Sequence, residues 1–118
     1  MNADELRLRT KKLAIRTVEL AEKMPNNYAT QVIGKQLIRS ATSVAANYRA
    51  VGRARSRADF INKMGIVLEE ADETLFWLEM LSDLKKIQGD EFNSILIESK
   101  EIVAIFTAAN KTARTNKK

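Results

Sequence analysis

Apolar residues return every three or four positions along most of the chain, which is the spacing of one face of an α-helix. The sequence contains only 4 glycines and 1 proline among its 118 residues, so we expect long helices and short connections. No segment alternates apolar and polar residues in the way that β-strands do, and no internal repeat is evident. The pattern therefore predicts an all-α protein.

The first two helices are predicted over residues 3–23 and 27–51. Asn2 and Glu5 have the spacing of a capping box, in which each side chain binds the backbone amide of the other residue. Pro25 ends the first helix, because a proline cannot continue one. The second helix carries an apolar seam of the kind that lines the core of a bundle, made of Ile33, Leu37, Ala41, Val44, Tyr48 and Val51.

The third helix is predicted to begin at a second capping box, formed by Ser56 and Asp59, and to end near Lys86. Just before it, Gly52 is expected to end the second helix with a positive φ, which glycine adopts easily. The core-facing residues of the third helix are expected to be Ile61, Met64, Leu68, Ala71, Leu75 and Leu78.

A fourth helix is predicted to start at Asp90, whose side chain can cap it. Its inward-facing residues are expected to be Phe92, Ile95, Leu96, Ile102, Val103, Phe106 and Ala109. Helices joined by short turns lie antiparallel to their neighbours in sequence, so we predict an antiparallel, up-down-up-down four-helix bundle. Residues 1–113 would form this single domain, and residues 114–118 a basic, frayed C-terminal tail.

The composition excludes several classes of chemistry. Cysteine and histidine are both absent, which removes disulfides, thiol nucleophiles, thiolate metal sites and the commonest general base. The third helix carries the acids Glu69, Glu70, Asp72, Glu73 and Glu79. The di-iron motif of helix bundles also needs histidine, so we expect these acids on a solvated face or paired with arginines. We predict no enzymatic activity, no cofactor and no metal site.

The cellular location of the protein is predicted from the lack of a membrane-spanning segment and of a signal peptide in the sequence. The sequence has no apolar run of the roughly 18 residues that a membrane helix needs. The first residues, MNADELRLRTKK, also lack the apolar stretch of a signal peptide. We therefore expect a cytoplasmic protein that does not contact a membrane.

The net charge of +5 hides an asymmetry along the chain. Residues 1–57 hold 12 Lys and Arg against 4 Asp and Glu, a balance of +8, while residues 58–118 hold 8 against 11, a balance of −3. A basic half of this kind suits a phosphate-bearing partner or an acidic protein surface. Small basic proteins are also common, so the asymmetry alone leaves both interpretations open.

The candidate nucleic-acid-binding residues lie on the first two helices and on the turn that follows them. A guanidinium group is permanently charged, and its planar fork fits a phosphate. Such contacts hold the backbone of RNA or DNA and carry no sequence information. The set comprises Arg9, Lys12, Arg16, Arg39, Arg49, Arg53, Arg55 and Arg57. The alternative is that some of these arginines pair with acids of the third helix, including those of a neighbouring protomer.

The third helix has a second apolar face, which predicts self-association. The residues of this face, which point away from the core stripe and form the candidate oligomer interface, are Phe76, Trp77, Met80 and Leu84. An exposed cluster of aromatic side chains is typical of an interface. The alternative is that the first and fourth helices wrap around the third and cover it. Small uncharged residues from Ser40 to Tyr48 also let another helix approach the second one closely, most simply inside the same bundle.

The second and third helices contain a distinctive stretch at residues 43–81, SVAANYRAVGRARSRADFINKMGIVLEEADETLFWLEML. It resembles the four-helix-bundle proteins encoded within intervening sequences of large-subunit ribosomal RNA genes, the S23-type family. The matching positions are Ser43, Asn47, Gly52-Arg53, Ser56, Phe60 and Glu69-Glu70 before Glu73. Many members carry Glu-Gly soon after the Asn. This chain has Arg49-Ala50-Val51-Gly52 there, so no role of that Glu transfers to it.

The resemblance implies a short antiparallel four-helix bundle, often assembled as a homopentamer, with a basic surface and nucleic-acid binding as the expected activity. A related bundle is the accessory protein of diversity-generating retroelements and partners a reverse transcriptase and RNA. Two functions follow. The first is a homo-oligomer, a pentamer by resemblance, that binds RNA or DNA non-specifically. The second is an interaction module that docks an enzyme such as a reverse transcriptase without binding nucleic acid directly.

Overall fold

Four α-helices make up almost all of the described chain. The computed structural model describes residues 1–115, and its helices are α1 (Ala3–Glu22), α2 (Tyr28–Val51), α3 (Arg57–Asp83) and α4 (Asp90–Thr115). No strand occurs in this part of the chain, so the predicted all-α class is confirmed. Helix α4 continues past residue 113 to Thr115, and the rest of the predicted tail, 116–118, lies outside the described residues.

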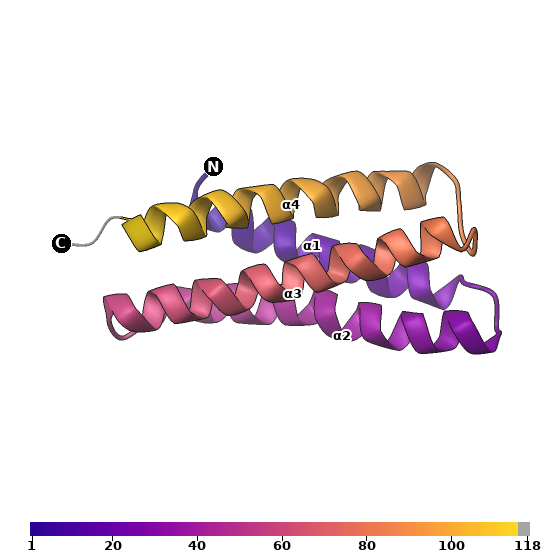
Figure 1. The fold of residues 1–118 in the computed structure, drawn as a ribbon, viewed down its shortest axis with the longest axis horizontal. Helices are drawn as coiled ribbons and strands as arrows, with labels where there is room; N and C mark the ends of the chain where they lie inside the picture. The colour runs from indigo at the N-terminus through magenta and orange to yellow at the C-terminus, as the bar shows by residue number, and fades with distance from the viewer. Residues whose placement is uncertain (116–118) are drawn as a thin grey trace.

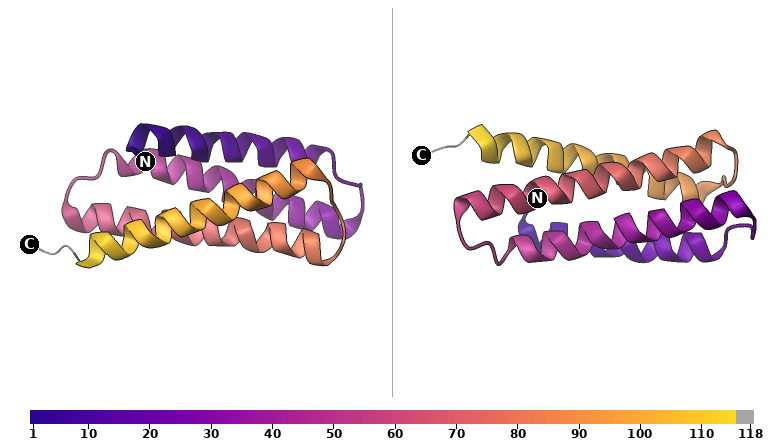
Figure 2. Two further views of the ribbon diagram at one scale, coloured as in Figure 1. Left: turned by 90° about the horizontal axis from the view of Figure 1, so that it is seen from above. Right: turned by 60° about the horizontal axis from the view of Figure 1, so that its bottom comes forward.

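The helices run alternately up and down around a common axis, as Figure 1 shows. Each helix packs against its neighbours in sequence, and α1 also meets α4, more sparsely than the other pairs meet, which closes the bundle. The result is a rod with extents of 51 × 21 × 20 Å. The start of α1, the end of α4 and the turn between α2 and α3 lie toward the same end of it (Figures 1 and 2). None of the described helices is both long and apolar enough to cross a membrane.

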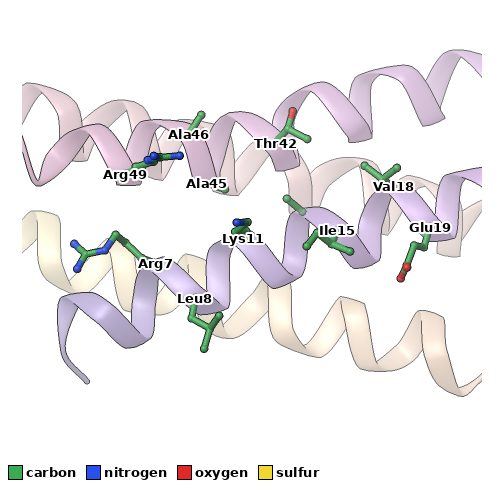
Figure 3. A pocket seen from close by; sticks show the side chains of 11 residues that line it. Arg7, Leu8, Lys11, Ile15, Val18, Glu19, Thr42, Ala45, Ala46 and Arg49 are labelled. Carbon is green, nitrogen blue, oxygen red and sulfur yellow. The ribbon is translucent and has the colours of Figure 1, made fainter.

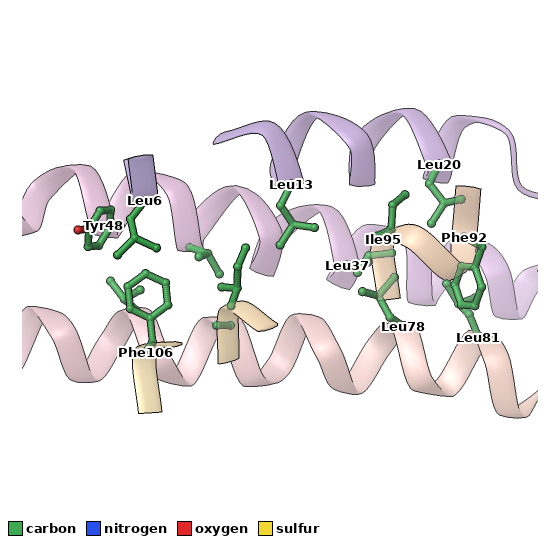
Figure 4. Close-up of a cluster of buried hydrophobic side chains, with 14 of the residues drawn as sticks. Leu6, Leu13, Leu20, Leu37, Tyr48, Leu78, Leu81, Phe92, Ile95 and Phe106 are labelled. Carbon is green, nitrogen blue, oxygen red and sulfur yellow. The ribbon is translucent and has the colours of Figure 1, made fainter. Parts of the chain in front are cut away.

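The core is one continuous cluster of apolar side chains drawn from all four helices (Figure 4). Leu37, Leu78, Ile95 and Phe106 are 0% exposed. The ring of Tyr48 lies 5.2 Å from that of Phe106, which joins α2 to α4 across the bundle. Burying a large apolar side chain contributes about 1.5–3 kcal/mol, so this cluster is the main source of stability.

On α3 the buried stripe is turned relative to the prediction. Val67, Thr74 and Leu81 are buried, whereas three of the predicted core residues are only half-buried, namely Ile61, Leu68 and Leu75. Helix α3 lies between α2 and α4, so its most buried side chains point at the gap between these two helices. Met64, Ala71 and Leu78 of the predicted stripe are buried as expected.

Polar groups in the core all find partners. The Thr74 hydroxyl lies 2.8 Å from the carbonyl oxygen of Glu70 and 3.0 Å from the hydroxyl of Ser40, which links α3 to α2. The Asn110 amide donates to the carbonyl of Met64 at 3.0 Å, which links α4 to α3. Among the described residues, no buried side-chain nitrogen or oxygen lacks a hydrogen bond. These paired groups avoid the desolvation cost that an unpaired buried polar atom carries.

The helix starts follow the predicted capping chemistry at Asn2 and in part at Ser56, whereas Asp90 is the first residue of α4 and not its cap. The Asn2 side chain accepts a bond from the Glu5 amide at 2.8 Å, and the Glu5 carboxylate accepts one from the Asn2 amide at 3.2 Å, so this capping box is confirmed. At the start of α3, Ser56 accepts from the Asp59 amide at 3.0 Å. The Asp59 carboxylate, however, binds the amide of Arg55 instead of that of Ser56, so the predicted second box is only half formed.

The two ends expected for α2 and α3 differ from the prediction in backbone conformation. Gly52 ends α2 with a φ of −63°, so the predicted positive φ is wrong there. Helix α3 ends at Asp83, earlier than expected, because Lys85 takes a φ of 56°. The Lys86 amide then donates to the Leu81 carbonyl at 2.9 Å. This is the Schellman arrangement, with a lysine at the position where glycine is usual.

Replacing Lys85 with glycine is expected to raise the free energy of unfolding by about 1 kcal/mol, because a side chain in the left-handed region costs roughly 1–2 kcal/mol. Urea unfolding at a fixed protein concentration measures the change. The matched control is Lys86→Gly, at a position without a positive φ, which should bring no gain. An equal gain in both variants would contradict the assignment of strain to Lys85.

Candidate nucleic-acid interface

Four of the predicted basic residues gather where the chain turns from α2 into α3. We call Arg49, Arg53, Arg55 and Arg57 the arginine elbow. All four side chains are exposed. In the described part of the chain, none of them forms an ion pair with a carboxylate. No acid of the described chain therefore neutralises their charges in an ion pair.

Packing of the neighbouring helix ends adds further basic residues beside the elbow. Arg57 donates to the carbonyl oxygen of Ala113 at 2.8 Å, which ties the start of α3 to the end of α4. A Cβ atom placed on Gly52 would lie 3.7 Å from a guanidinium nitrogen of Arg7, so this side chain reaches the turn from α1. Arg114 of α4 comes equally close to α3, 3.6 Å from a Cβ placed on Gly65.

Arg7 and Arg114 are not among the predicted site residues. Their positions near the start of the first helix and the end of the fourth could have indicated them. An up-down bundle brings the start of the first helix and the end of the fourth to the turn between the second and third. Basic residues at those helix ends therefore belong beside the elbow. Arg7 also pairs with Asp4 on its own helix, so its charge is partly balanced.

A shallow hollow of about 670 Å³ lies beside the elbow, lined by Ala50, Arg53, Arg55, Asp59 and Lys63. Asp59 is its one acid. Lys63 lies 2.7 Å from one Asp59 oxygen, and the Arg55 amide donates to the other at 2.9 Å. The ammonium group of Lys63, followed by this amide, lowers the pKa of Asp59, so the carboxylate stays ionised.

The ionised Asp59 also affects how a phosphate could bind. Anions favour the free amides at a helix N-terminus, and here Asp59 lies at the start of α3 with its carboxylate on the Arg55 amide. A phosphate at the elbow would therefore depend mainly on arginine side chains rather than on these amides.

Two other predicted residues join α1 to α4 instead of facing a partner. The Arg9 guanidinium donates to Glu98 at 2.8 Å and to Glu101 at 3.0 Å. The hydrogen bonds to Glu98 raise the pKa of Arg9. Arg16 lies 3.3 Å from Glu91. These pairs bridge the two helices that pack most sparsely, so they orient α1 on α4.

Arg39 likewise joins α2 to α3. Its guanidinium pairs with Glu70 at 3.2 Å and more closely with Glu73. Glu73 also accepts a bond from the indole nitrogen of Trp77 at 3.1 Å. The bonds from Arg39, and then from Trp77, lower the pKa of Glu73. The alternative in which arginines pair with acids of the third helix therefore holds for Arg39 within one chain.

The structure thus divides the predicted basic surface into separate parts. The elbow residues lie together at one end of the rod, whereas Arg9, Arg16 and Arg39 each bind acids of a neighbouring helix. Lys12 is exposed on α1 and has no ion pair in the described chain. Within residues 1–115, no three acids gather closely enough to hold a metal ion.

The candidate oligomer interface on α3 is only partly open to solvent. Phe76 is 48% exposed and Leu84 46% exposed. Trp77 and Met80 are half-buried and pack against the core, so the bundle covers part of the second apolar face. The Phe76 and Trp77 rings meet edge to face, with their centroids 4.9 Å apart. What remains for a partner is a narrow strip along α3.

Comparison with known proteins agrees with this architecture. A solved structure of a protein of unknown function from the S23 ribosomal protein family of Bacteroides thetaiotaomicron is 38% identical to this chain. It superposes with a TM-score of 0.83, over 94% of this chain and 99% of that one. No curated protein matches the chain.

A family model described as 23S rRNA-intervening sequence protein matches residues 5–108, a range that begins in α1 and ends in α4. The match covers most of the described chain and includes the arginine elbow. Four helices, the matched range and the similar structure agree with the resemblance of residues 43–81. The chain therefore belongs to the family of 23S rRNA-intervening sequence proteins.

Proposed function

We propose that the protein is a homo-oligomer that binds RNA or DNA through the arginine elbow without recognising base sequence. The observation that carries the proposal is the group of exposed guanidinium groups without carboxylate partners in the described chain. Acids elsewhere in the fold pair with Arg9, Arg16 and Arg39. Asp59, the acid beside the elbow, binds the Lys63 ammonium and the Arg55 amide, and it forms no ion pair with an elbow guanidinium. The family description mentions 23S rRNA, which favours RNA as the first nucleic acid to test.

The physical basis is the release of counterions from the phosphate backbone. Each phosphate that a basic residue neutralises frees a condensed cation, so affinity falls steeply as salt rises. Arginine side chains that contact only phosphates position the nucleic acid and leave the bases unread. Repeating the elbow in an oligomer would let several weak contacts act on one strand, which raises the overall affinity.

Self-association is supported by the exposed side chains of α3. Phe76 on α3 and Leu84 directly after it keep nearly half of their surface in contact with water, although α3 already packs against both α2 and α4. Large apolar groups of this kind are favoured at the centre of interfaces. The pentamer implied by the family resemblance is the expected assembly.

The triple variant Arg53→Ala, Arg55→Ala, Arg57→Ala is expected to bind structured RNA and duplex DNA at least tenfold more weakly than the wild type at low salt. On duplex DNA the slope of log affinity against log salt should fall by about 2–3, because each lost phosphate contact removes about 0.9. Fluorescence anisotropy at several salt concentrations measures both quantities.

The matched control removes the same number of positive charges elsewhere, as Lys23→Ala, Lys35→Ala, Lys100→Ala, three exposed lysines away from the elbow. It should lower affinity far less. Wild-type protein that fails to bind at low salt, or equal losses in the two triple variants, would reject the elbow as the interface. The first of these outcomes would leave the interaction module as the better hypothesis.

Native mass spectrometry of the wild type is expected to show an assembly of several 13.3 kDa chains, with five chains implied by the resemblance. Phe76→Glu should reduce it to monomers, because burying an unpaired carboxylate in an interface is strongly unfavourable. The helix content of this variant should be unchanged, since Phe76 is exposed. A monomeric wild type at micromolar concentration would contradict self-association.

A further inference from the structure

A groove runs between α1 and α2 on the outside of the bundle (Figure 3). Its volume is about 750 Å³. Small side chains, Ala45 and Ala46 of α2, form one wall, and the larger Leu8 and Ile15 stand on α1. Leu8 is 69% exposed and Ile15 50% exposed, so in a single chain this apolar surface lies open to water.

The groove carries charge at its ends. Arg7 and Arg49 line the end toward the elbow and Glu19 lines the opposite end, while Lys11 lies between Leu8 and Ile15, as Figure 3 shows. An occupant should therefore present an apolar side chain at the middle of the groove and carboxylates beside Lys11. A helix suits this shape better than a compact ligand, because the lining residues extend along α1 from Arg7 to Glu19 and along α2 from Thr42 to Arg49.

The same chain carries a surface with these properties on α3. Glu69, Asp72 and Phe76 are spaced by three and four residues, so they lie on one face of the helix. All three are exposed. We call them the α3 stripe. The buried Ala71 and Leu78 point to the core, so the stripe faces away from it, and α3 itself lies diagonally opposite α1 in the bundle.

The heights of groove and stripe along the rod can be compared from two contacts. Between α2 and α3, the Ser40 and Thr74 hydroxyls lie 3.0 Å apart. Between α1 and α2, a Cβ placed on Gly34 would lie 4.0 Å from the Cβ of Ala21. Ile15 lies six residues before Ala21 on α1, and Ser40 lies six residues after Gly34 on α2. Because α1 and α2 are antiparallel, both steps lead the same distance in the same direction along the rod. Ile15, Ser40 and Thr74 therefore share one height.

This register matches the groove to the stripe. Phe76 lies two residues after Thr74, so it lies close to the height of Ile15. Lys11 lies one helical turn before Ile15, at the height of the α3 segment between Glu69 and Asp72. Two copies placed side by side, parallel and without a shift along the rod, would set an aromatic ring against Ile15. They would also set two carboxylates around Lys11. Apolar contact and opposite charge then coincide at the same heights.

We propose that the α1–α2 groove receives the α3 stripe of a second copy of the chain. The proposal rests on the self-association part of the proposed function and names the surface that meets α3. Because groove and stripe are different surfaces on opposite sides of the bundle, the contact is heterologous. Repetition of such a contact builds a ring when the rotation between copies closes, and an open filament when it does not.

The proposal also separates the two roles of the basic residues. Arg49 lies at the rim of the groove as well as at the elbow, whereas Arg53, Arg55 and Arg57 do not line the groove. The latter three therefore remain free for phosphate when copies associate. In an assembly of parallel copies, all elbows lie at the same end and form one basic surface.

Mixing two variants tests the heterologous contact directly. Ile15→Glu blocks the groove and leaves the stripe intact, while Phe76→Glu blocks the stripe and leaves the groove intact. Each variant alone is expected to be monomeric. A mixture should form 1:1 heterodimers, in which the intact stripe of Ile15→Glu enters the intact groove of Phe76→Glu. Nothing larger should form, because the other groove and the other stripe of the pair are both blocked. Native mass spectrometry resolves the species.

The matched control is Ile97→Glu, since Ile97 is an isoleucine on α4 that is 58% exposed and lies outside both surfaces. It should keep the wild-type assembly. Circular dichroism of every variant confirms folding, and Leu8→Glu provides a second blocked groove. Wild-type assembly in Ile15→Glu and Leu8→Glu would overturn the proposal, as would a mixture that stays monomeric.

Exchanging charges across the contact gives a second test. Lys11→Glu and Asp72→Lys are each expected to weaken association at least tenfold, because like charges then meet in the groove. The double variant restores opposite charges. The logarithm of its association constant should recover at least half of the decrease that the single variants show. Sedimentation velocity at fixed salt measures the constants. Additive losses in the double variant would overturn the proposed pairing.

These outcomes are distinguishable from a failure of the proposed function. A monomeric wild type removes self-association and the groove contact together. An oligomer that is indifferent to the groove variants removes the groove contact alone. Nucleic-acid binding by the elbow is measured separately, and none of the variants used here changes Arg53, Arg55 or Arg57.

Discussion

Burial of one apolar stripe from each helix is the interaction on which the rest of the molecule depends. The connections between the helices are too short for any arrangement but antiparallel neighbours, and the stripes can leave water only by facing one another. Side chains such as Leu37, Leu78 and Ile95 are then wholly excluded from solvent. Once this core is formed, the rotation of each helix about its axis and its position along the rod are set, and these decide where each surface residue lies. The placement of the charges is a consequence of it.

Ion pairs divide the arginines into two groups with different roles. Arg9 and Arg16 span α1 and α4, where apolar packing is sparse, and Arg39 spans α2 and α3. Pairs near the protein surface contribute about 0–1 kcal/mol each, so their main effect is on the orientation of the helices. The acids of the second half of the chain are thereby partly neutralised. The arginines of the elbow have no such partners in the described chain, and the positive charge is concentrated at one end of the rod.

The two proposed interactions use different sides of this rod and support each other. A contact between the α1–α2 groove and the α3 stripe acts across the width of the bundle, while the elbow lies at its end. Association in parallel would thus gather elbows without covering them. Weak phosphate contacts gain strength from such repetition, because several of them act on the same strand. A small protein with modest surface charge can hold a long polyanion in this way.

The amino-acid sequence by itself determined the four helices, the caps at Asn2 and Ser56, and the antiparallel order of the helices. Periodicity, Asn2, Pro25 and Ser56 act locally, within a few residues of the positions they control. Apolar spacing separates helix from strand, and the short connections make helices that follow one another in sequence antiparallel. Two exceptions concern helix ends. Gly52 ends α2 without the expected positive φ. Lys85 after α3 does take a positive φ, because the last turn of α3 closes with a Schellman bond.

Only the tertiary structure decided which charges are free and which apolar surfaces are open. Arg9 and Arg53 are the same residue type on the same basic half of the chain, yet one binds Glu98 and the other faces solvent. The difference depends on which acid the packing brings within reach, and that acid lies far away in sequence. In the same way, Trp77 was covered by its own bundle while Ile15 was left in an open groove. Long-range packing sets these distances, and no local pattern contains them.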